Sequence, residues 1–516
     1  MSRSRVAPGV VLGVALVLVA AVACSSSSRP PTTPPAETAA ARAPSLLDHV
    51  PADTPFLLSS TGSSFAGAQL HDILDELRAE LSPVLEMTSD DMLASMEPNE
   101  RILFVALRAV ASLGAADLGR LGLDPSRVEL AVYGWGLTPV MRLRLDGRFL
   151  RDLVARALKD AGLDDPALRW GEHTYRTWTF DSGLQLVAVV LDDQLVMAFS
   201  RRAEKVLPHL VGDAAGRPAR GFELATIRAR YPQLEGEPVL FIDPARAAAL
   251  VERGDELRAL LPELPPACPR ALASLVRSFP PIAATTTEPN RKTRESRFVI
   301  GPSPALAKTV AALARPIPRW PGDDARAGEA TYGVGLAPLA TLEAVAGYVD
   351  AAAGTATACG VTPPPTTMRE AIRSLAPVLA PVNGATFVIH EIAETEDMPL
   401  QVELVADVTD PYAIYSWMSS QLGLPPRPPA LGSPTAVSLG FLPSTIVLEA
   451  GAFAATLGRH DPTALAALRH APAGPRELVR VAMGAGTTDN NPDGATLLHA
   501  RLEGDTIVMD MVERAP

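Results

Sequence analysis

The histidines of this chain are too far apart in the sequence to form a local metal site. A zinc-binding helix needs two of them at positions i and i+4, so that both rings reach one ion. The eight are His49, His71, His173, His209, His390, His460, His470 and His499. Because no two have that spacing, we find no local signature of metal catalysis and expect neither a metal nor a cofactor.

The richest acidic stretch is HEIAETEDM, residues 390–398, which follows the strand-like sequence ATFVI. Its carboxylates, beside His390, could collect a divalent cation. They belong to Glu391, Glu394, Glu396 and Asp397. A charged turn between two strands accounts for the same residues, and we favour that interpretation because charge runs usually form solvated surface.

A second acidic stretch, TTDNNPDG, begins like a calcium-binding loop. Asp489, Asn491, Asp493 and Gly494 reproduce the opening spacing of that loop. The twelfth position should be a glutamate that binds through both oxygens, but it is Ala500. Since Asn-Pro-Asp-Gly is also an ordinary turn sequence, we predict a turn between strands here instead of a calcium site.

Motifs for nucleophilic catalysis and for nucleotide binding are missing from the sequence. It contains neither G-x-S-x-G nor S-x-x-K, and GSSFAG at Gly62 has the wrong spacing for a nucleophile elbow. We interpret that segment as the loop into a helix that begins near Ser63 or Ser64. Neither a phosphate-binding loop nor a strand-linked G-x-G-x-x-G occurs. A triad dispersed along the chain escapes such searches, so a hydrolase stays our third hypothesis.

Several aspartates instead occupy one recurring structural position. A strand, a polar residue, a proline and a helical run follow each other at Asp243-Pro244, Asp410-Pro411 and Asp461-Pro462. Ser303-Pro304 repeats the pattern, and Ala337-Pro338 does so without a capping oxygen. Proline suits the first helical position, which lacks a partner for its N–H in any case. We therefore predict helix N-caps, each contributing about 1 kcal/mol, in place of catalytic bases.

The elements that would position these residues alternate between hairpins and helices. Residues 146–162 place apolar side chains along one side of a helix, and LDDQLVMAF, from Leu191, has the pattern of a hairpin. LEGDTIVMDM, from Leu502, resembles that hairpin and suggests an internal duplication. We predict an α+β fold of repeated antiparallel hairpin-plus-helix units, with the helices packed on one sheet face.

Clusters of proline, glycine and charge divide the folded body. They lie near residues 212–220 and 316–328 and predict three α+β units, at 45–215, 219–325 and 328–516. We expect the last unit to contain a duplicated half. The proline-rich stretch at 425–434 is more consistent with a loop inside it.

Composition limits both the cores and the partners. The 516 residues are 47% hydrophobic but only 5% aromatic, so leucine, valine and alanine must fill the cores. A formal net charge of −12 disfavours nucleic acid, whose binding requires clustered lysine and arginine. Apart from Cys24, the cysteines are Cys268 and Cys359, which we propose as a disulfide, with buried free thiols as the alternative.

The N-terminus reads as an export signal. Arg3 and Arg5 precede an apolar run from residue 6 to 22, which predicts a signal peptide over residues 1–23. Ala21-Val22-Ala23-Cys24 resembles a bacterial lipobox, which implies that Cys24 carries fatty acids such as palmitate and becomes the mature N-terminus. An uncleaved transmembrane anchor is the alternative. Residues 24–44 are rich in Ser, Thr and Pro and predict a tether.

The stretch VPADTPFLLSS then marks the start of the fold, with a turn at Pro51 and Pro55 and a strand from Phe56. This lipobox, tether and P-A-D-T-P opening together resemble an uncharacterised group of exported bacterial lipoproteins built on a domain of unknown function. The resemblance covers residues 45–215 and implies the boundary and the envelope location only.

From these features we expect a non-catalytic cell-envelope lipoprotein that acts as a tethered binding or scaffold module. Its membrane partner would be reached through the N-terminal lipid anchor, at the outer membrane or a periplasmic face, and an envelope protein would be its other partner. A carrier of a lipid or other apolar ligand is the alternative, because a sheet covered by Ala- and Leu-rich helices can enclose an apolar cavity.

Overall fold

The structure is a computed structural model that describes most of the chain after the predicted tether. The described parts are residues 45–61, positions between 101 and 121, 129–164, 167–179, 183–212, positions between 227 and 258, 264–290, 292–324, 327–362, 368–391, 400–439, 442–458, 462–484 and 494–514. The chain folds as two compact units. Unit 1 runs to Leu264 without Leu234–Gly236, and unit 2 consists of those three residues and Pro265–Pro516.

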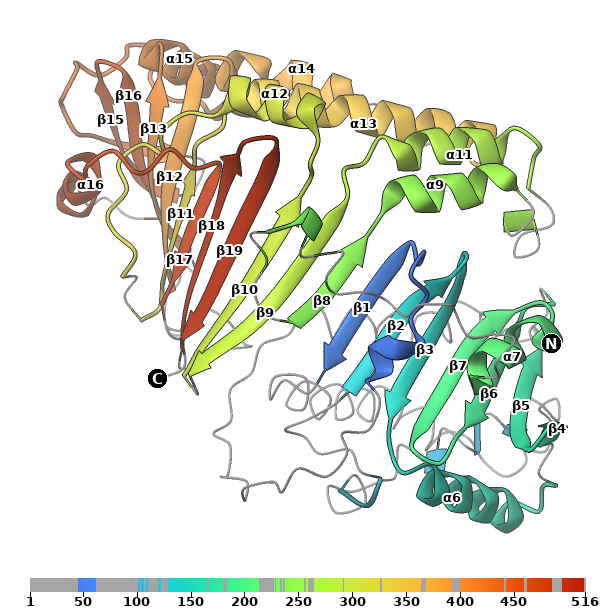
Figure 1. Cartoon of the computed structure of the whole chain (residues 1–516). Coiled ribbons are helices and arrows are strands. Elements are labelled where there is room, and N and C mark those ends of the chain that lie inside the picture. The colour runs from blue at the N-terminus through green and yellow to red at the C-terminus, as the bar shows by residue number, and fades with distance from the viewer. Residues whose placement is uncertain are drawn as a thin grey trace, which may run out of the picture. The chain divides into compact units, whose positions relative to one another are not determined.

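Unit 1 contains eight described strands, all paired antiparallel, in the order β8–β1–β2–β3–β7–β6–β5–β4 (Figure 1). The strands are β1 Phe56–Thr61, β2 Glu129–Trp135, β3 Thr138–Arg144, β4 Leu168–Trp170, β5 His173–Thr179, β6 Gln185–Val190, β7 Gln194–Ser200 and β8 Glu237–Ile242. Its helices with described bounds are the short η1 Leu46–His49, α6 Gly147–Asp160, α7 Ala203–Val211 and α9 Pro244–Arg253. The first strand thus begins at Phe56, as predicted.

Unit 2 contains eleven described strands, again all antiparallel, in the order β9–β10–β19–β18–β17–β11–β12–β13–β16–β15–β14. They are β9 Ile282–Asn290, β10 Thr293–Ile300, β11 Glu329–Val334, β12 Val382–Glu391, β13 Leu400–Val408, β14 Thr435–Leu439, β15 Leu442–Glu449, β16 Ala452–Leu457, β17 Val479–Met483, β18 Ala495–Glu503 and β19 Thr506–Arg514. Its helices are α11 Cys268–Arg277, α12 Pro304–Leu313, α13 Pro338–Ala358, α14 Met368–Leu379, α15 Pro411–Leu422 and α16 Pro462–Arg469. The predicted α+β class is confirmed, and sheet predominates in it.

One order of elements recurs in both units. In unit 1 the hairpin β2–β3 leads to α6, a meander returns β7 to the side of β3, and α7 then leads to β8 beside β1. In unit 2 the hairpin β12–β13 leads to α15, a meander returns β16 to the side of β13, and α16 leads to β17 beside β11. Helices α6 and α7 therefore correspond to α15 and α16.

The hairpins that resemble each other in sequence do not occupy equivalent positions in this shared order. LDDQLVMAF forms β6–β7, whose counterpart in unit 2 is β15–β16, whereas LEGDTIVMDM forms β18–β19. The two share turn chemistry but not a place in the topology. The division between the units at residues 264–265 falls within the predicted second unit, and the division into three units stays a prediction.

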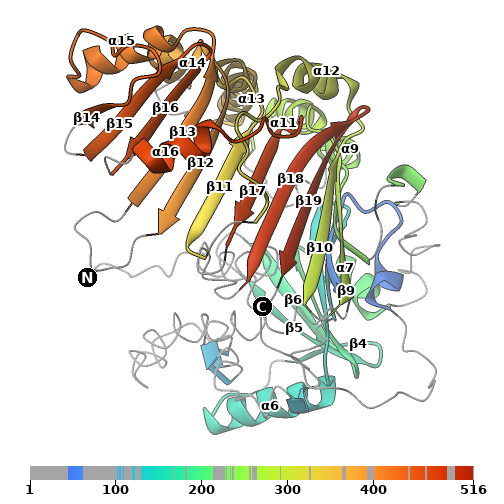
Figure 2. The ribbon, with the colours of Figure 1, turned by 90° about the vertical axis from the view of Figure 1, so that its left-hand side faces the viewer.

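The prediction that helices cover one sheet face is wrong for the best-packed part of unit 2. Helix α15 packs with Ile446 and Phe453 on one face, and α16 packs through Leu465 with Val405 and Val447 on the other (Figure 2). Successive strand residues point to opposite faces, so these neighbouring positions must be buried separately. Strands such as β15 and β16 are apolar on both faces and need a helix on each.

In unit 1, α6 and α7 also cover opposite faces. Leu150 of α6 packs with Leu195 of β7, while the neighbouring Gln194 faces the other side, toward the end of α7. The helix predicted within residues 146–162 is confirmed, and its N-cap is Asp146, which accepts hydrogen bonds from the backbone N–H of Arg148 and Phe149. The shared order of elements thus extends to the placement of the helices.

The packing of α16 can be tested by truncating its central leucine. Leu465 is fully buried, so Leu465→Ala should destabilise the protein by roughly 2–5 kcal/mol through lost burial and the cavity left behind. Leu422→Ala, at an exposed end of α15, is the matched control and should change the free energy of unfolding by less than about 0.5 kcal/mol. Equal effects in urea unfolding would contradict the two-sided packing.

Candidate functional site

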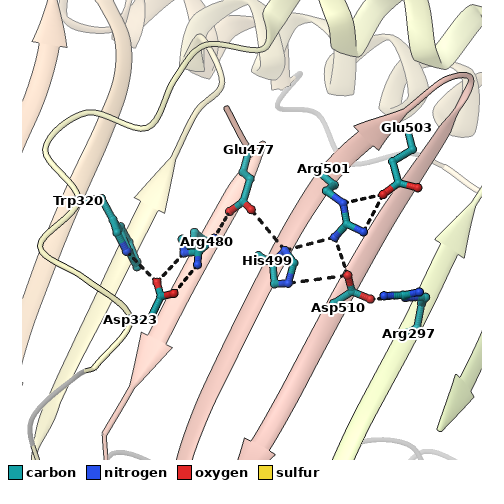
Figure 3. A network of polar contacts seen from close by, with 9 residues as sticks. All are labelled: Arg297, Trp320, Asp323, Glu477, Arg480, His499, Arg501, Glu503 and Asp510. Carbon is teal, nitrogen blue, oxygen red and sulfur yellow. Dashed lines mark hydrogen bonds and ion pairs between the residues drawn. The ribbon is translucent and has the colours of Figure 1, made fainter. Parts of the chain in front are cut away.

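A row of ionisable side chains crosses four strands of unit 2 and is its most developed polar cluster among the described residues. Strand register places Arg297 opposite Asp510, Asp510 opposite His499, and His499 opposite Arg480, on β10, β19, β18 and β17 respectively. Directly opposed residues lie on the same face of a sheet, with Cβ atoms about 5 Å apart. Antiparallel register alone therefore brings these four side chains together (Figure 3).

Flanking residues extend this row, and we call the whole set the charge ladder. Arg501 donates to Asp510 at 2.5 Å and to Glu503 at 2.6 Å, while Glu477 accepts from Arg480 at 2.7 Å. Further contacts join Arg297 with Asp510 and connect His499 with Glu477 and Asp510. The ladder consists of Arg297, Asp323, Glu477, Arg480, His499, Arg501, Glu503 and Asp510.

Trp320 closes one end of the ladder, and a glycine makes room for it. Arg480 donates through two nitrogens to Asp323, at 2.8 and 2.5 Å, and Trp320 Nε1 donates to the same carboxylate at 3.0 Å. A Cβ on Gly333, which is opposite Arg480 in register, would come within 2.9 Å of the Trp320 ring. That is closer than real Cβ contacts, so only glycine permits the indole to lie there.

Neighbouring charges favour the ionised form of three ladder carboxyls, those of Asp323, Glu477 and Asp510. The pKa of Asp323 lies below its ordinary value mainly because Arg480 donates to it. Burial opposes ionisation of Asp510, but hydrogen bonds from Arg297 and Arg501 outweigh burial and lower its pKa. Burial likewise opposes ionisation of Glu477, yet His499 and Arg480 bring its pKa below the ordinary value.

These directions decide what the ladder can do chemically. A general acid at neutral pH needs a carboxyl whose pKa is raised toward 7, and an effective base needs an accessible lone pair. The carboxyls of Asp323, Glu477 and Asp510 have lowered pKa values and already accept from guanidinium groups. The arrangement is therefore suited to joining four strands and does not resemble an acid–base pair poised for catalysis.

A second polar cluster lies inside unit 1, around the fully buried Arg142. Its guanidinium donates to Tyr133 Oη and Gln194 Oε1, each at 2.9 Å, and to the carbonyls of His209 and Leu210 at 3.0 and 3.3 Å. Those carbonyls belong to the last turn of α7, where the helix dipole favours a cation. Arg142 therefore joins β3 to the C-terminal end of α7.

Aromatic rings enclose this buried arginine cluster. Tyr133 Oη lies 2.9 Å from His209 Nε2, and the His209 ring stacks on Trp135 with centroids 5.4 Å apart. Burial raises the pKa of Tyr133, although Arg142 opposes this shift. The phenol thus stays protonated at neutral pH and serves as a hydrogen-bonding bridge.

The predicted acidic stretch is only partly within the described residues. His390 lies between two carboxylates, with Nε2 3.1 Å from Glu403 and Nδ1 3.7 Å from Glu329. Glu394, Glu396 and Asp397 lie outside the described residues. Within the described parts of the chain, no group of three or more His, Cys, Asp or Glu residues is arranged to hold a metal ion.

The predicted caps are confirmed where the structure describes them. Asp243 accepts from the backbone N–H groups of Ala245 and Arg246, Asp410 from those of Tyr412 and Ala413, and Ser303 from that of Leu306. Ala337 precedes α13 without a side-chain cap, as predicted.

Other predicted site residues lie outside the described residues. They are Cys24, Ser63, Ser64, His71, Asp461, His460, Asp489, Asn491 and Asp493. The lipidation, the loop at Gly62 and the turn at 487–494 therefore stay predictions.

The disulfide between Cys268 and Cys359 is confirmed, with Cα atoms 4.4 Å apart. It joins the first residue of α11 to the C-cap of α13. Thr355 of α13 also contacts the Ala271 carbonyl of α11, so the two helices lie side by side near the bridge.

The comparisons give no relative from which a function could be transferred. No family model matches the chain, and neither the curated proteins nor the solved structures include a significant match. The resemblance based on the P-A-D-T-P segment therefore stays a prediction. Among the described residues, no helix is long and apolar enough to cross a membrane.

The charge ladder predicts a loss of stability in acid. Its carboxyls have folded-state pKa values below the ordinary 4.5 for Glu477 and 3.8 for Asp323 and Asp510, so their stabilisation is present above those values and is lost as pH falls through the folded ones. We expect the free energy of urea unfolding to decline below about pH 4.5.

The variant Asp510→Asn tests whether the ladder causes this decline. It should cost roughly 1.5–3 kcal/mol at neutral pH, because it removes the buried carboxylate that accepts from the partly exposed Arg297 and Arg501, and it should flatten the acid decline. Asp350→Asn, in an exposed pair with Arg369, is the control and should cost less than about 1 kcal/mol. An unchanged acid profile in Asp510→Asn would refute the assignment.

The disulfide predicts a large difference between oxidised and reduced protein. The bridge spans 91 residues of sequence, so its removal in a Cys268→Ala/Cys359→Ala double variant should destabilise the protein by about 4–5 kcal/mol. Chemical denaturation of the oxidised wild-type protein and of the double variant measures this difference. Two free thiols in the denatured but unreduced wild-type protein would contradict the bridge.

Proposed function

We propose that the protein is a non-catalytic cell-envelope lipoprotein, anchored through acylated Cys24, whose folded body acts as a binding or scaffold module. The lipobox, signal peptide and tether support the anchor and the location, at the outer membrane or a periplasmic face. Its partners would be the membrane, reached through the lipid, and a protein of the envelope.

The main support for the module role is that the charged side chains of the ladder form ion pairs with one another. Arg480 is shared between Asp323 and Glu477, and Asp510 accepts from both Arg297 and Arg501. Such cross-strand contacts stabilise a broad sheet and leave its polar groups already paired. A rigid, extended sheet with helices on it suits the presentation of a surface to another molecule.

The fold also supports a finer proposal about how this body is built. We infer that the hairpin-plus-helix unit is its smallest repeated part, because α6 and α15 each follow a hairpin and each begin at an aspartate cap, Asp146 and Asp410. Repetition of one unit is an economical way to build a wide binding surface.

Substitution of the lipidation site tests the anchor. Cys24→Ala should shift the protein from the membrane fraction to the soluble fraction and abolish incorporation of labelled palmitate, because the acyl chains provide the anchoring. The Cys268→Ala/Cys359→Ala variant is the control and should remain in membranes. Undiminished membrane association of Cys24→Ala would favour an uncleaved transmembrane anchor.

Native mass spectrometry of the gently extracted protein separates the scaffold from its alternatives. A bound protein, or the bare acylated chain, agrees with the module. A reproducible small mass that is lost on unfolding would favour the carrier of an apolar ligand. Hydrolysis of ester or peptide substrates by the purified protein would favour the hydrolase.

A further inference from the structure

Helix α13 of unit 2 is apolar on most of its circumference and yet largely uncovered. Its 21 residues include only two charged side chains, Glu343 and Asp350, and only Ala346 is buried. A helix that is hydrophobic all round is normally enclosed by protein or lipid. The exposure of α13 therefore indicates a surface that lipid or another protein covers.

The large exposed side chains of this helix lie together. Val345, Tyr348 and Val349 occupy positions i, i+3 and i+4, so they share one side of the helix, and they are 42%, 38% and 41% exposed. Phe279, just beyond α11, is 48% exposed and stacks on Tyr348 with ring centroids 5.9 Å apart. We call Phe279, Val345, Tyr348 and Val349 the apolar patch. Contiguous exposed apolar residues of this kind mark interaction sites.

The two helices that contact α13 are basic, and we call their arginines the arginine border. The Cys268–Cys359 bridge joins α11 to α13, and the Asp350–Arg369 ion pair joins α13 to α14. The three helices carry four arginines against three carboxylates, although the chain as a whole has a net charge of −12. The arginines are Arg270, Arg277, Arg369 and Arg373, all exposed.

We propose that the apolar patch and its arginine border dock the body of the protein on an anionic phospholipid bilayer. Apolar side chains that enter the interface, combined with arginines that attract anionic headgroups, are the features of surface-bound helices. The charge of the border is complementary to such lipids. Exposed aromatic rings such as Tyr348 and Phe279 also suit the boundary between headgroups and acyl chains.

This docking rests on the proposed anchor at Cys24. A tether of residues 24–44, if extended at about 3.1 Å per residue, reaches at most about 65 Å, so the anchor would keep the patch at a high effective concentration near the membrane. A low intrinsic affinity of the patch for lipid is then sufficient for docking, because the anchor already holds the protein at the membrane. The body would alternate between a docked state and a released state in which the patch is free.

An environment-sensitive probe on the patch tests the docking. The full chain, exported and acylated by its bacterial host, is labelled with a nitrobenzoxadiazole dye at Tyr348→Cys and reconstituted into phosphatidylcholine vesicles with about 25% phosphatidylglycerol. Tyr412→Cys on α15 is the matched control, since Tyr412 is also an aromatic residue on a helix and is 39% exposed. We expect a blue shift and a rise in emission of about twofold or more at position 348 only.

A charge placed in the patch should reverse this result. Val345→Asp should remove the emission change of the probe at position 348 while the protein still floats with the vesicles through its acyl chains. Leu422→Asp, at an equally exposed leucine on α15, should leave the change intact. Unchanged thermal unfolding of both variants would show that the fold persists.

The outcomes separate the docking from the anchor on which it rests. Vesicle-bound protein with equal emission at positions 348 and 412 would overturn the docking and leave the tethered module standing. Protein that does not float at all would overturn both. A blue shift at position 348 that appears without vesicles and grows with protein concentration would overturn the docking in favour of a second copy of the chain covering the patch.

Discussion

The structure depends on one constraint, which is that a strand with apolar side chains on both faces must be covered on both. Strands β15 and β16 bury consecutive residues, such as Val447 and Leu448, that point in opposite directions. One helix cannot cover both sets. Helix α15, in the connection from β13 to β14, therefore covers one face, and α16, in the connection from β16 to β17, covers the other.

The same constraint accounts for the shared order of elements in the two units. In both units a hairpin, a helix, a meander and a second helix pair β3 with β7, or β13 with β16, and cover both faces of the resulting sheet. The buried Arg142 shows how unit 1 secures its second helix, because its guanidinium caps the end of α7 from β3. Covering both faces thus determines where the helices occur in the sequence as well as where they pack.

Local features of the sequence predicted the local features of the fold. Asp243 and Asp410 were identified as caps because the interaction spans only two or three residues, and Cys268 and Cys359 were paired because the chain offers no other candidates beyond Cys24. The side of the sheet that each helix covers was predicted wrongly. That choice depends on which strands become neighbours, and β13 and β16 are separated in sequence by α15 and two strands.

The charge ladder shows why this site could not be identified from sequence alone. Arg297 is 213 residues from Asp510, and the four residues of the central row sit in strands among ordinary alternating residues. Only the register of β10, β19, β18 and β17 aligns them, and Gly333, whose role requires the Trp320 ring to lie above it, gives no signal on its own. Because Asp510 on β19 is held by guanidinium groups from β10 and β18, the ladder stabilises the pairing that creates it. Strand register and charge pairing therefore stabilise each other, and the charge pairs cannot be predicted from the sequence without knowing the register.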